Sequence, residues 1–292
     1  MKIAITGASG FIGTEVTKAL QKKENIEILA LTRKENRTEK NVSWVHTDYS
    51  VKSLSEILRG ADAVIHLAAV RGTTGLISDY HKNEMITENI LIAMGESEVK
   101  KIILASSIAV YSDTEKIPWR EEEPLRPKTL YGITKASCEY LCHYYSKKYG
   151  FHYAAVRIAQ VLGLGEKRKG MMNVFLETAY AHGEIRVMGR SSARRQYIYV
   201  KDLAEIMSRL ACMDSVQSVI LNAGMKTAYS NLEIARLVNW VFENDTPIQY
   251  DDSFPETTEP SHMDIRFLKE YLGYEPMEME QVLADVRKDM GK

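Results

Sequence analysis

The sequence predicts an α/β fold in which a doubly wound parallel sheet carries helices on both faces, and three observations predict it. Short runs rich in Ile, Val and Leu recur along the first two thirds of the chain without polar alternation, as in strands buried on both faces. Longer amphipathic segments separate these runs, which indicates alternating strands and helices. The first run leads into a glycine-rich turn that opens a helix.

The elements follow from this alternation. Strands are predicted at residues 2–6, 26–32, 42–46, 62–67, 100–106 and 153–158. Helices are predicted between them at residues 11–22, 53–59, 83–94 and 131–148. Three prolines within residues 112–130 block regular structure, so a long loop is expected before the last of these helices. Residues 251–262, with two prolines, form a second expected irregular segment.

The chain has 292 residues, and a typical domain holds about 100–200, so two domains are expected. The regular alternation weakens after about residue 162. We therefore expect a first domain over residues 1–162 and a smaller, mainly substrate-binding C-terminal domain over residues 163–292. A strand and a helix around residues 196–222 are expected to return to the first domain.

Composition excludes several classes of protein. Lys plus Arg is 38 and Asp plus Glu is 39, so a net charge of −1 gives no electrostatic reason to expect nucleic-acid or membrane-surface binding. No stretch approaches the about 18 apolar residues of a membrane helix. The three cysteines suit a reducing compartment. Cys138 and Cys142, four apart on one predicted helix, fit packed core thiols better than a metal site. We expect a cytoplasmic protein without a metal.

The turn after the first strand has the features of a phosphate-binding loop. Gly7, Gly10 and Gly13 lie between the strand and the helix. Glycines let the backbone turn sharply and approach a pyrophosphate, whose charge the helix N-terminus favours. The position of the triplet, directly after a strand and before a helix, is the context that such a loop requires.

The segment Thr-Gly-Ala-Ser-Gly-Phe-Ile-Gly, residues 6–13, resembles the nucleotide fingerprint of the extended short-chain dehydrogenases/reductases. This family contains nucleotide-sugar epimerases, dehydratases and reductases. The resemblance implies a Rossmann-type fold and a nicotinamide cofactor. In this loop the cofactor-binding residues that it implies are Gly7, Ser9, Gly10, Phe11, Ile12 and Gly13.

The end of the second strand decides between NAD and NADP. An acidic residue there binds the ribose hydroxyls of NAD, whereas a basic residue accommodates the 2′-phosphate of NADP. This chain has Thr32 followed by Arg33, whose guanidinium suits a forked contact with phosphate. NADP is therefore favoured, and NAD stays open if Arg33 only stacks on the adenine. By resemblance, Asp48 and Tyr49 after the third strand line the adenine site.

Tyr131 and Lys135 form a Tyr-x-x-x-Lys pair on one face of a predicted helix. A phenol titrates near pH ~10. A neighbouring ammonium stabilises the phenolate, which would let a tyrosine act as a base at neutral pH. The fifth strand ends in Ser106 and Ser107, where open α/β sheets place their ligands. Residues 106–111 resemble the family's Ser-Ser-x-x-Val-Tyr segment, which makes Ser107 the catalytic hydroxyl.

The resemblance assigns roles to these residues. It implies that Ser107 holds the substrate oxygen, that Tyr131 exchanges its proton, and that Lys135 binds the nicotinamide ribose and tunes Tyr131. Further residues fit the family's cofactor loop after the fourth strand and its Asn-x-x-x-Thr-x-Asn helix: His66, Leu67, Ala68 and Ala69 in the loop, and Asn83, Thr87 and Asn89 in the helix. His66 by itself is interpreted as packing, and Asn83 as structural.

The residues after Ser107 restrict the reaction. Dehydratases of this family carry an Asp-Glu pair there, and a second branch carries a cysteine, whereas this chain has Ile108 and Ala109. Neither side chain can transfer a proton. Simple hydride chemistry is therefore expected, either 4-epimerisation through a transient keto sugar or one-way reduction of a keto sugar.

The substrate half resembles the family less closely. Arg195 matches the arginine that reaches the nucleotide diphosphate, with Arg194 beside it, and Asp202 is expected to cap the next helix. Gln160 stands where the family usually places a phosphate-binding Asn. Residues 254–257 replace the family's Arg-Pro-Gly-Asp, so one diphosphate arginine is missing. Ser107, Gln160 and Arg195 are the predicted substrate contacts.

The leading hypothesis is a nucleotide-sugar 4-epimerase of the UDP-hexose or UDP-N-acetylhexosamine type. The alternative is an NADPH-dependent reductase of a nucleotide-linked keto sugar or related carbonyl, which Arg33 and the thin diphosphate site favour. A catalytically silent NADP(H)-sensing protein is a third hypothesis. By resemblance a homodimer is expected, through helices around residues 83–94 and 131–149.

Overall fold

The computed structural model describes residues 1–39, 41–72, 75–167, 170–214, 217–255 and 258–291. Its strands are β1 (Lys2–Thr6), β2 (Glu27–Thr32), β3 (Arg37–Glu39), β4 (Val42–His46), β5 (Ala63–His66), β6 (Lys101–Ala105), β7 (His152–Ile158), β8 (Gln160–Leu162), β9 (Arg186–Met188), β10 (Arg195–Tyr199), β11 (Val219–Ala223), β12 (Ala228–Tyr229) and β13 (Gln249–Asp251). Its α-helices are α1 (Phe11–Gln21), α2 (Val51–Leu58), α3 (Ile77–Glu96), α4 (Leu130–Tyr149), α5 (Met171–Tyr180), α6 (Val200–Cys212), α7 (Asn231–Phe242), α8 (Arg266–Leu272) and α9 (Met279–Met290).

Among the described residues, eight strands form the main sheet in the order β11-β7-β6-β5-β1-β2-β4-β3. Each neighbouring pair is parallel except β3 with β4, which is antiparallel. The predicted fold class, a doubly wound parallel sheet, is confirmed. The six predicted strands lie within one residue of β1, β2, β4, β5, β6 and β7 at each end.

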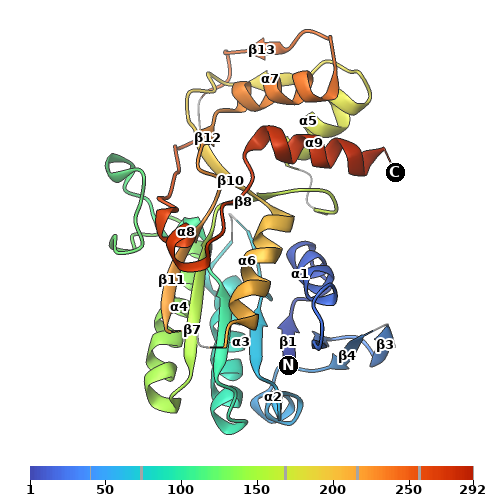
Figure 1. Ribbon diagram of the computed structural model, residues 1–292. Coiled ribbons are helices and arrows are strands. Elements are labelled where there is room, and N and C mark those ends of the chain that lie inside the picture. The colour runs from blue at the N-terminus through green and yellow to red at the C-terminus, as the bar shows by residue number, and fades with distance from the viewer. Residues whose placement is uncertain (40, 73–74, 168–169, 215–216, 256–257, 292) are drawn as a thin grey trace.

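Both faces of the sheet are covered, which explains why its strands lack polar alternation. Ile3 and Ile5 of β1 pack with α1 and α6 in one core, whereas Ala4 packs with α2, α3 and α4 in another. Figure 1 shows α1 and α6 side by side in front of the sheet. β4 differs from the prediction because only Val42 is buried and the strand lies near the sheet edge.

The strand order reverses direction between β1 and β5. From β1 the chain builds outward through β2 and β4, and from β5 it builds the other way through β6, β7 and β11. Loops that leave neighbouring strands at such a switch point diverge and open a crevice at the carboxyl ends. The glycine loop after β1 and the loop after β5 therefore flank the crevice where a dinucleotide is expected.

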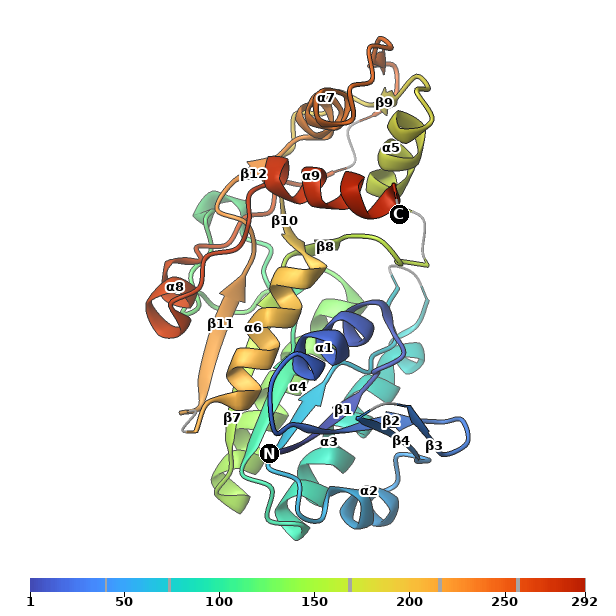
Figure 2. The same ribbon diagram turned by 45° about the vertical axis from the view of Figure 1, so that its right-hand side comes forward.

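A third core lies in the C-terminal part of the chain, formed by α5, α7 and α9 with β8 and β10. Figure 2 shows these helices beyond the carboxyl ends of the main strands. β11 joins the edge of the main sheet, and α6 packs against α1. These two elements therefore lie with the N-terminal elements. The division at residue 162 into two domains stays a prediction.

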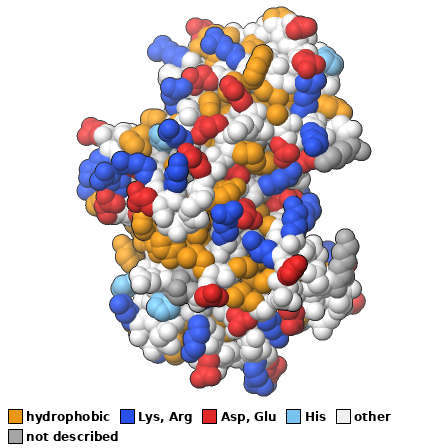
Figure 3. Space-filling model, in the orientation of Figure 1, with side chains coloured by type: hydrophobic (Ala, Val, Ile, Leu, Met, Phe, Trp, Pro, Cys, Tyr) orange, Lys and Arg blue, Asp and Glu red, His pale blue; other side chains and the backbone are white. Residues whose placement is uncertain are grey.

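On the face drawn in Figure 3, acidic and basic side chains are interspersed rather than gathered into a field of one sign. This agrees with the near-neutral balance of charges in the sequence. Within the described residues, every helix is too short or too polar to cross a membrane.

Candidate active site

The turn between β1 and α1 has the geometry of an anion cradle. Gly7 has φ +71°, a left-handed conformation that favours glycine, and its carbonyl oxygen accepts the N–H of Gly10 at 2.9 Å. A Cβ on Gly13 would lie 2.2 Å from the same carbonyl oxygen, so α1 can pack this closely only with glycine there. Gly10 is the N-cap residue and has no side chain to cap α1, which leaves the first N–H groups for a ligand.

The loop after β5 lies against this cradle. The Thr6 hydroxyl oxygen accepts the N–H groups of Leu67 and Ala68, both at 3.1 Å. A Cβ on Gly7 would lie 2.9 Å from the Ala68 nitrogen, so the two loops are in direct contact. Leu67, Ala68 and Ala69 are partly exposed beside the glycine turn, as a cofactor-lining loop requires.

His66 at the end of β5 is buried between two hydroxyl groups. Its Nδ1 lies 2.7 Å from the Thr6 hydroxyl and its Nε2 lies 3.0 Å from that of Thr87. Burial, and then the positive charge of Lys135, lower the pKa of His66 to about 3. The ring is neutral at physiological pH, which agrees with a packing role.

The asparagines of α3 hold neighbouring loops in place. The side chain of Asn83 binds the N–H of Val70 at 2.6 Å and its carbonyl oxygen at 3.0 Å, which fixes the loop after β5. Asn89 donates to the carbonyl oxygen of Tyr49 at 2.9 Å. The helix begins at Ile77, not at Asn83, because Asp79 accepts the N–H at residue 76 and starts it earlier.

The end of β2 carries the residues predicted to select the cofactor. Thr32 is buried and its hydroxyl accepts the N–H of Lys34 at 3.1 Å, whereas the Arg33 side chain is exposed. Asp48 is exposed and accepts the N–H of Ser50 at 2.8 Å, and this hydrogen bond lowers the pKa of its carboxyl group.

Tyr49 is half-buried next to this strand end. Burial raises the pKa of its phenol, and the charge of Arg33 opposes the rise.

The catalytic candidates meet where β6 ends against the start of α4. Ser107 is the N-cap of a short 3-10 helix, η1 (Ile108–Val110), and its hydroxyl accepts the N–H of Ala109 at 3.1 Å. A Cβ on Gly132 would lie 2.2 Å from the Ala109 carbonyl oxygen, so the first turn of α4 touches η1. Tyr131, the residue before Gly132, is thereby placed next to the serine segment.

Lys135 is buried one turn further along α4. Its Nζ donates to the carbonyl oxygen of Ala105 at 2.6 Å and lies 5.7 Å from the centre of the Tyr131 ring. The cradle of glycines, the uncapped helix start and this lysine together fit a nicotinamide dinucleotide.

Two of the three predicted substrate contacts, Gln160 and Arg195, lie on the neighbouring strands β8 and β10, whereas Ser107 lies after β6. Gln160 is exposed and is paired in the sheet with Tyr197, and Arg195 binds the Asn231 side chain at 2.9 Å. Arg194 forms an exposed ion pair with Glu233, which is an ordinary surface role for an arginine. Of the segment 254–257, residues 256–257 lie outside the described residues.

The prediction that Asp202 caps α6 is wrong. The N-cap residue is Tyr199, and Asp202 is buried in the first turn. Its carboxylate accepts the hydroxyl of Tyr274 and, at 2.9 Å, the N–H of Met277. It therefore anchors the segment between α8 and α9 to α6, a long-range role that local spacing does not reveal.

Two features near the site were not predicted. Arg71, after β5, forms an ion pair at 3.0 Å with Glu166, after β8, and so joins two loops that border the crevice. A groove of about 920 Å³ opens between α1, α6 and residues 164–167. Of the predicted site residues it is lined by Ser9, Gly10 and Phe11, and it does not include the catalytic candidates.

Among the described residues, no group of three or more His, Cys, Asp or Glu side chains is placed to hold a metal ion. Cys138 and Cys142 are buried free thiols, and Cys212 is a partly buried one. Burial raises the pKa of both α4 thiols, which disfavours the reactive thiolate.

Comparison with known proteins agrees with this geometry. The model of the NAD dependent epimerase/dehydratase family matches residues 3–224. A UDP-glucose 4-epimerase of Lactobacillus helveticus is 28% identical over 276 residues, which cover 85% of this chain and 83% of that protein. The solved UDP-N-acetylglucosamine 4-epimerase from Bacillus cereus is 30% identical, with a TM-score of 0.89 over 100% of this chain and 96% of its own.

A second solved structure shares the fold. The UDP-glucuronic acid 4-epimerase from Bacillus cereus, in complex with UDP-glucuronic acid and NAD, is 24% identical and has a TM-score of 0.84 over 99% of this chain and 100% of its own. The family match covers most of the chain and includes the glycine loop, the serine segment and the Tyr-x-x-x-Lys pair. The chain belongs to the NAD dependent epimerase/dehydratase family.

Proposed function

We propose that this protein is a nucleotide-sugar 4-epimerase that acts on a UDP-hexose or a UDP-N-acetylhexosamine. The observation that carries the proposal is the meeting of the serine segment and the start of α4 at the cofactor edge, with Ile108 and Ala109 in place of dehydratase acids. The relatives' own substrates, UDP-glucose and UDP-N-acetylglucosamine, support the substrate class.

In this proposal Tyr131 removes the proton of the sugar 4-hydroxyl, and Ser107 donates a hydrogen bond to the same oxygen. Lys135 holds its charge next to the phenolate and contacts the cofactor ribose. The nicotinamide, when bound, supplies reversible hydride transfer at sugar carbon 4. The keto sugar then turns in the site and is reduced on its other face, and Tyr131 returns the proton to the carbonyl oxygen, which becomes the new hydroxyl. The partly exposed positions of Ser107 and Tyr131 support this access to substrate.

The cofactor is proposed to lie along Gly7–Gly13, Thr32, Arg33, Asp48, Tyr49 and Leu67–Ala69. Exposed Arg33 favours NADP, whereas the relative solved with NAD supports the alternative. An NADPH-dependent keto-sugar reductase is the second candidate function, because a reductase consumes free cofactor. We also propose a homodimer that is formed through α3 and α4.

The first test is incubation of the purified protein, without added cofactor, with UDP-, dTDP-, GDP- and CDP-hexoses and N-acetylhexosamines. Proton NMR that detects a second sugar isomer at equilibrium is the expected result. Mass spectrometry of the nucleotide released on denaturation identifies NAD or NADP. Turnover only with added NADPH and a keto sugar would instead assign the reductase.

The second test replaces the proposed base. Tyr131→Phe is expected to lower kcat by about 10²–10⁴-fold, the usual contribution of a positioned acid–base group. Tyr149→Phe, on the last turn of the same helix, is the matched control and should keep wild-type turnover. Wild-type kcat in Tyr131→Phe would show that another group moves the proton.

A further inference from the structure

A buried ion pair lies directly behind the serine segment. Glu139 of α4 and Arg157 of β7 are 4% and 2% exposed, and Arg157 contacts the carboxylate at 2.8 Å and 3.1 Å. Burying two charges has a large desolvation cost, so such a pair is weak evidence of stabilisation. The role of the ion pair must therefore be judged from the residues that hydrogen-bond to it.

The pair is bonded to both ends of the segment that presents Ser107. The hydroxyl of Ser106 donates to the Glu139 carboxylate, and Arg157 donates to the hydroxyl oxygen of Tyr111. Arg157 also lies over the Tyr111 ring, 4.9 Å from its centre. Residues 106 and 111 are thus bonded to one rigid charged unit, and Ser107 lies between them.

The same helix face carries the catalytic candidates. Tyr131, Lys135 and Glu139 follow one another at intervals of four residues, which places them on one face of α4. Lys135 holds the carbonyl oxygen of Ala105 at 2.6 Å, and Glu139 holds the next residue, Ser106. Two successive turns of α4 therefore hold two successive residues of the strand end.

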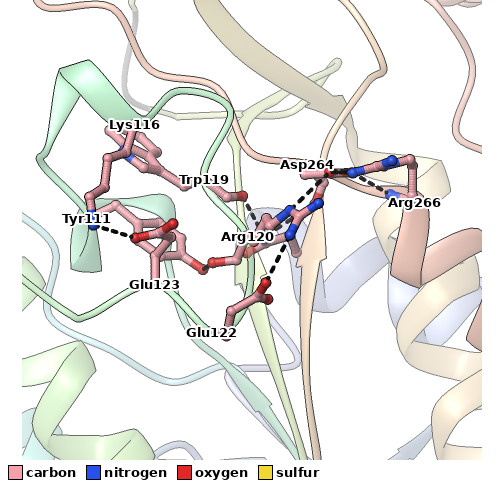
Figure 4. Close-up of polar contacts among 9 residues, drawn as sticks. Tyr111, Lys116, Trp119, Arg120, Glu122, Glu123, Asp264 and Arg266 are labelled. Carbon is pink, nitrogen blue, oxygen red and sulfur yellow. Dashed lines mark hydrogen bonds and ion pairs between the residues drawn. The ribbon is translucent and has the colours of Figure 1, made fainter.

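Beyond Tyr111 the bonding continues into the loop before α4 and the C-terminal segment. The Tyr111 hydroxyl lies 3.0 Å from Asn222 Oδ1, and the Asn222 amide nitrogen donates to the carbonyl oxygens of Trp119 and Asp264. Figure 4 shows Trp119 and Arg120 beside Asp264, whose carboxylate lies between Arg120 and Arg266. Tyr111, the last residue of the serine segment, is therefore held by Asn222 as well as by Arg157.

We propose that Glu139 and Arg157 are positioning residues that set the place of the Ser107 hydroxyl relative to Tyr131. This inference rests on the proposed function. Neither side chain is accessible to a substrate, because both are almost fully buried. They act through Ser106 and Tyr111, so loss of either bond should let the segment move without changing the groups that meet the sugar.

Ser106→Ala tests the proposal with little change in volume. We expect kcat to fall about 10–100-fold, since a displacement of about 1 Å can cost 10²-fold. KM should stay within about 2-fold, and the shape of the pH profile should stay that of the wild type. Ser146→Ala is the matched control, because Ser146 is also buried on α4 but its hydroxyl donates to the carbonyl oxygen of His143 in the same helix.

Hydrogen–deuterium exchange gives a readout that needs no turnover. Peptides covering residues 104–111 should exchange faster in Ser106→Ala than in the wild type, and at the wild-type rate in Ser146→Ala. Tyr111→Phe, which removes the other contact, should behave like Ser106→Ala. Unchanged exchange and kcat in both variants would overturn the inference. If the wild-type protein converts no nucleotide sugar, the proposed function fails and the exchange rates alone decide this inference.

Discussion

At the scale of single residues, the bonding around His66 fixes its ring in one neutral form. The Thr6 hydroxyl already accepts two backbone N–H groups, so its own proton is directed to Nδ1 of His66. The Thr87 hydroxyl is within 2.7 Å of the Asn83 carbonyl oxygen, so it donates there and accepts from Nε2. This network satisfies an Nε2–H imidazole and offers no acceptor for a second ring proton.

This burial predicts a pH dependence of stability. The unfolded imidazole titrates near 6.5, whereas in the folded protein its pKa is about 3. Between these values the unfolded state binds more protons, so the free energy of unfolding decreases as the pH falls from 6.5 toward 3. From pH 7 to pH 5 this residue should account for a loss of about 2 kcal/mol.

Urea unfolding at both pH values checks this prediction. His66→Gln should show a pH 7 to pH 5 difference smaller than that of the wild type by about 2 kcal/mol. His152→Gln is the control, because His152 is exposed on β7 and should leave the difference unchanged. A His66→Gln variant with the full wild-type difference would contradict the assignment of the neutral ring.

At the scale of elements, the first turn of α4 depends on one glycine. Gly132 lies against the Ala109 carbonyl oxygen of η1, and a methyl group there would clash with backbone rather than with a movable side chain. Gly132→Ala favours the helix by about 1 kcal/mol in propensity, but it should push the Ser107 segment away from Tyr131. We expect kcat to fall at least about 10²-fold.

The measurement compares kcat and far-UV circular dichroism of Gly132→Ala with those of Gly291→Ala. Gly291 has ordinary space for a Cβ, 3.8 Å from the nearest atom, and lies at the end of α9. Both variants should retain the wild-type spectrum, and only Gly132→Ala should lose activity. Full activity of Gly132→Ala would mean that the contact between α4 and η1 does not position the serine.

There are physical reasons why the sequence did not predict some of the elements. β3 has three exposed residues, so it carries no hydrophobic pattern to reveal it. The early start of α3 depends on one carboxylate bond at Asp79 rather than on periodicity. The glycine loop and the Tyr-x-x-x-Lys pair were predictable because their spacing is local. Glu139 and Arg157 were not, because the sequence separates them by 18 residues and only the packing of α4 against β7 brings them together.

At the scale of the whole molecule, the C-terminal part is joined to the catalytic edge by backbone contacts. Trp119 donates its N–H to the His262 carbonyl oxygen at 2.9 Å and accepts that of Asp264 at 2.8 Å. Within the C-terminal part, the buried side chain of Gln196 binds both the N–H and the carbonyl oxygen of Met263, each at 3.0 Å. These partners are far apart in the sequence, so composition and periodicity could indicate a second region but not how it is attached.

The surface of α3 and α4 predicts where two chains would meet in the proposed homodimer. Met85, Tyr140 and Tyr144 are 59%, 65% and 61% exposed on these two packed helices. A two-fold dimer uses the same patch on both chains, and a stable dimer buries about 800 Å² on each partner. The exposed apolar side chains of α3 and α4 would contribute to this buried area.

The double variant Tyr140→Glu, Tyr144→Glu would bury four carboxylates in such an interface. We expect the wild-type protein to sediment with twice the mass of one chain and the double variant with the mass of a single chain. Trp240→Glu, at a similarly exposed residue on α7, is the control and should remain dimeric. A wild-type monomer would exclude the dimer. Dissociation by Trp240→Glu, with the double variant still dimeric, would move the interface to the C-terminal part.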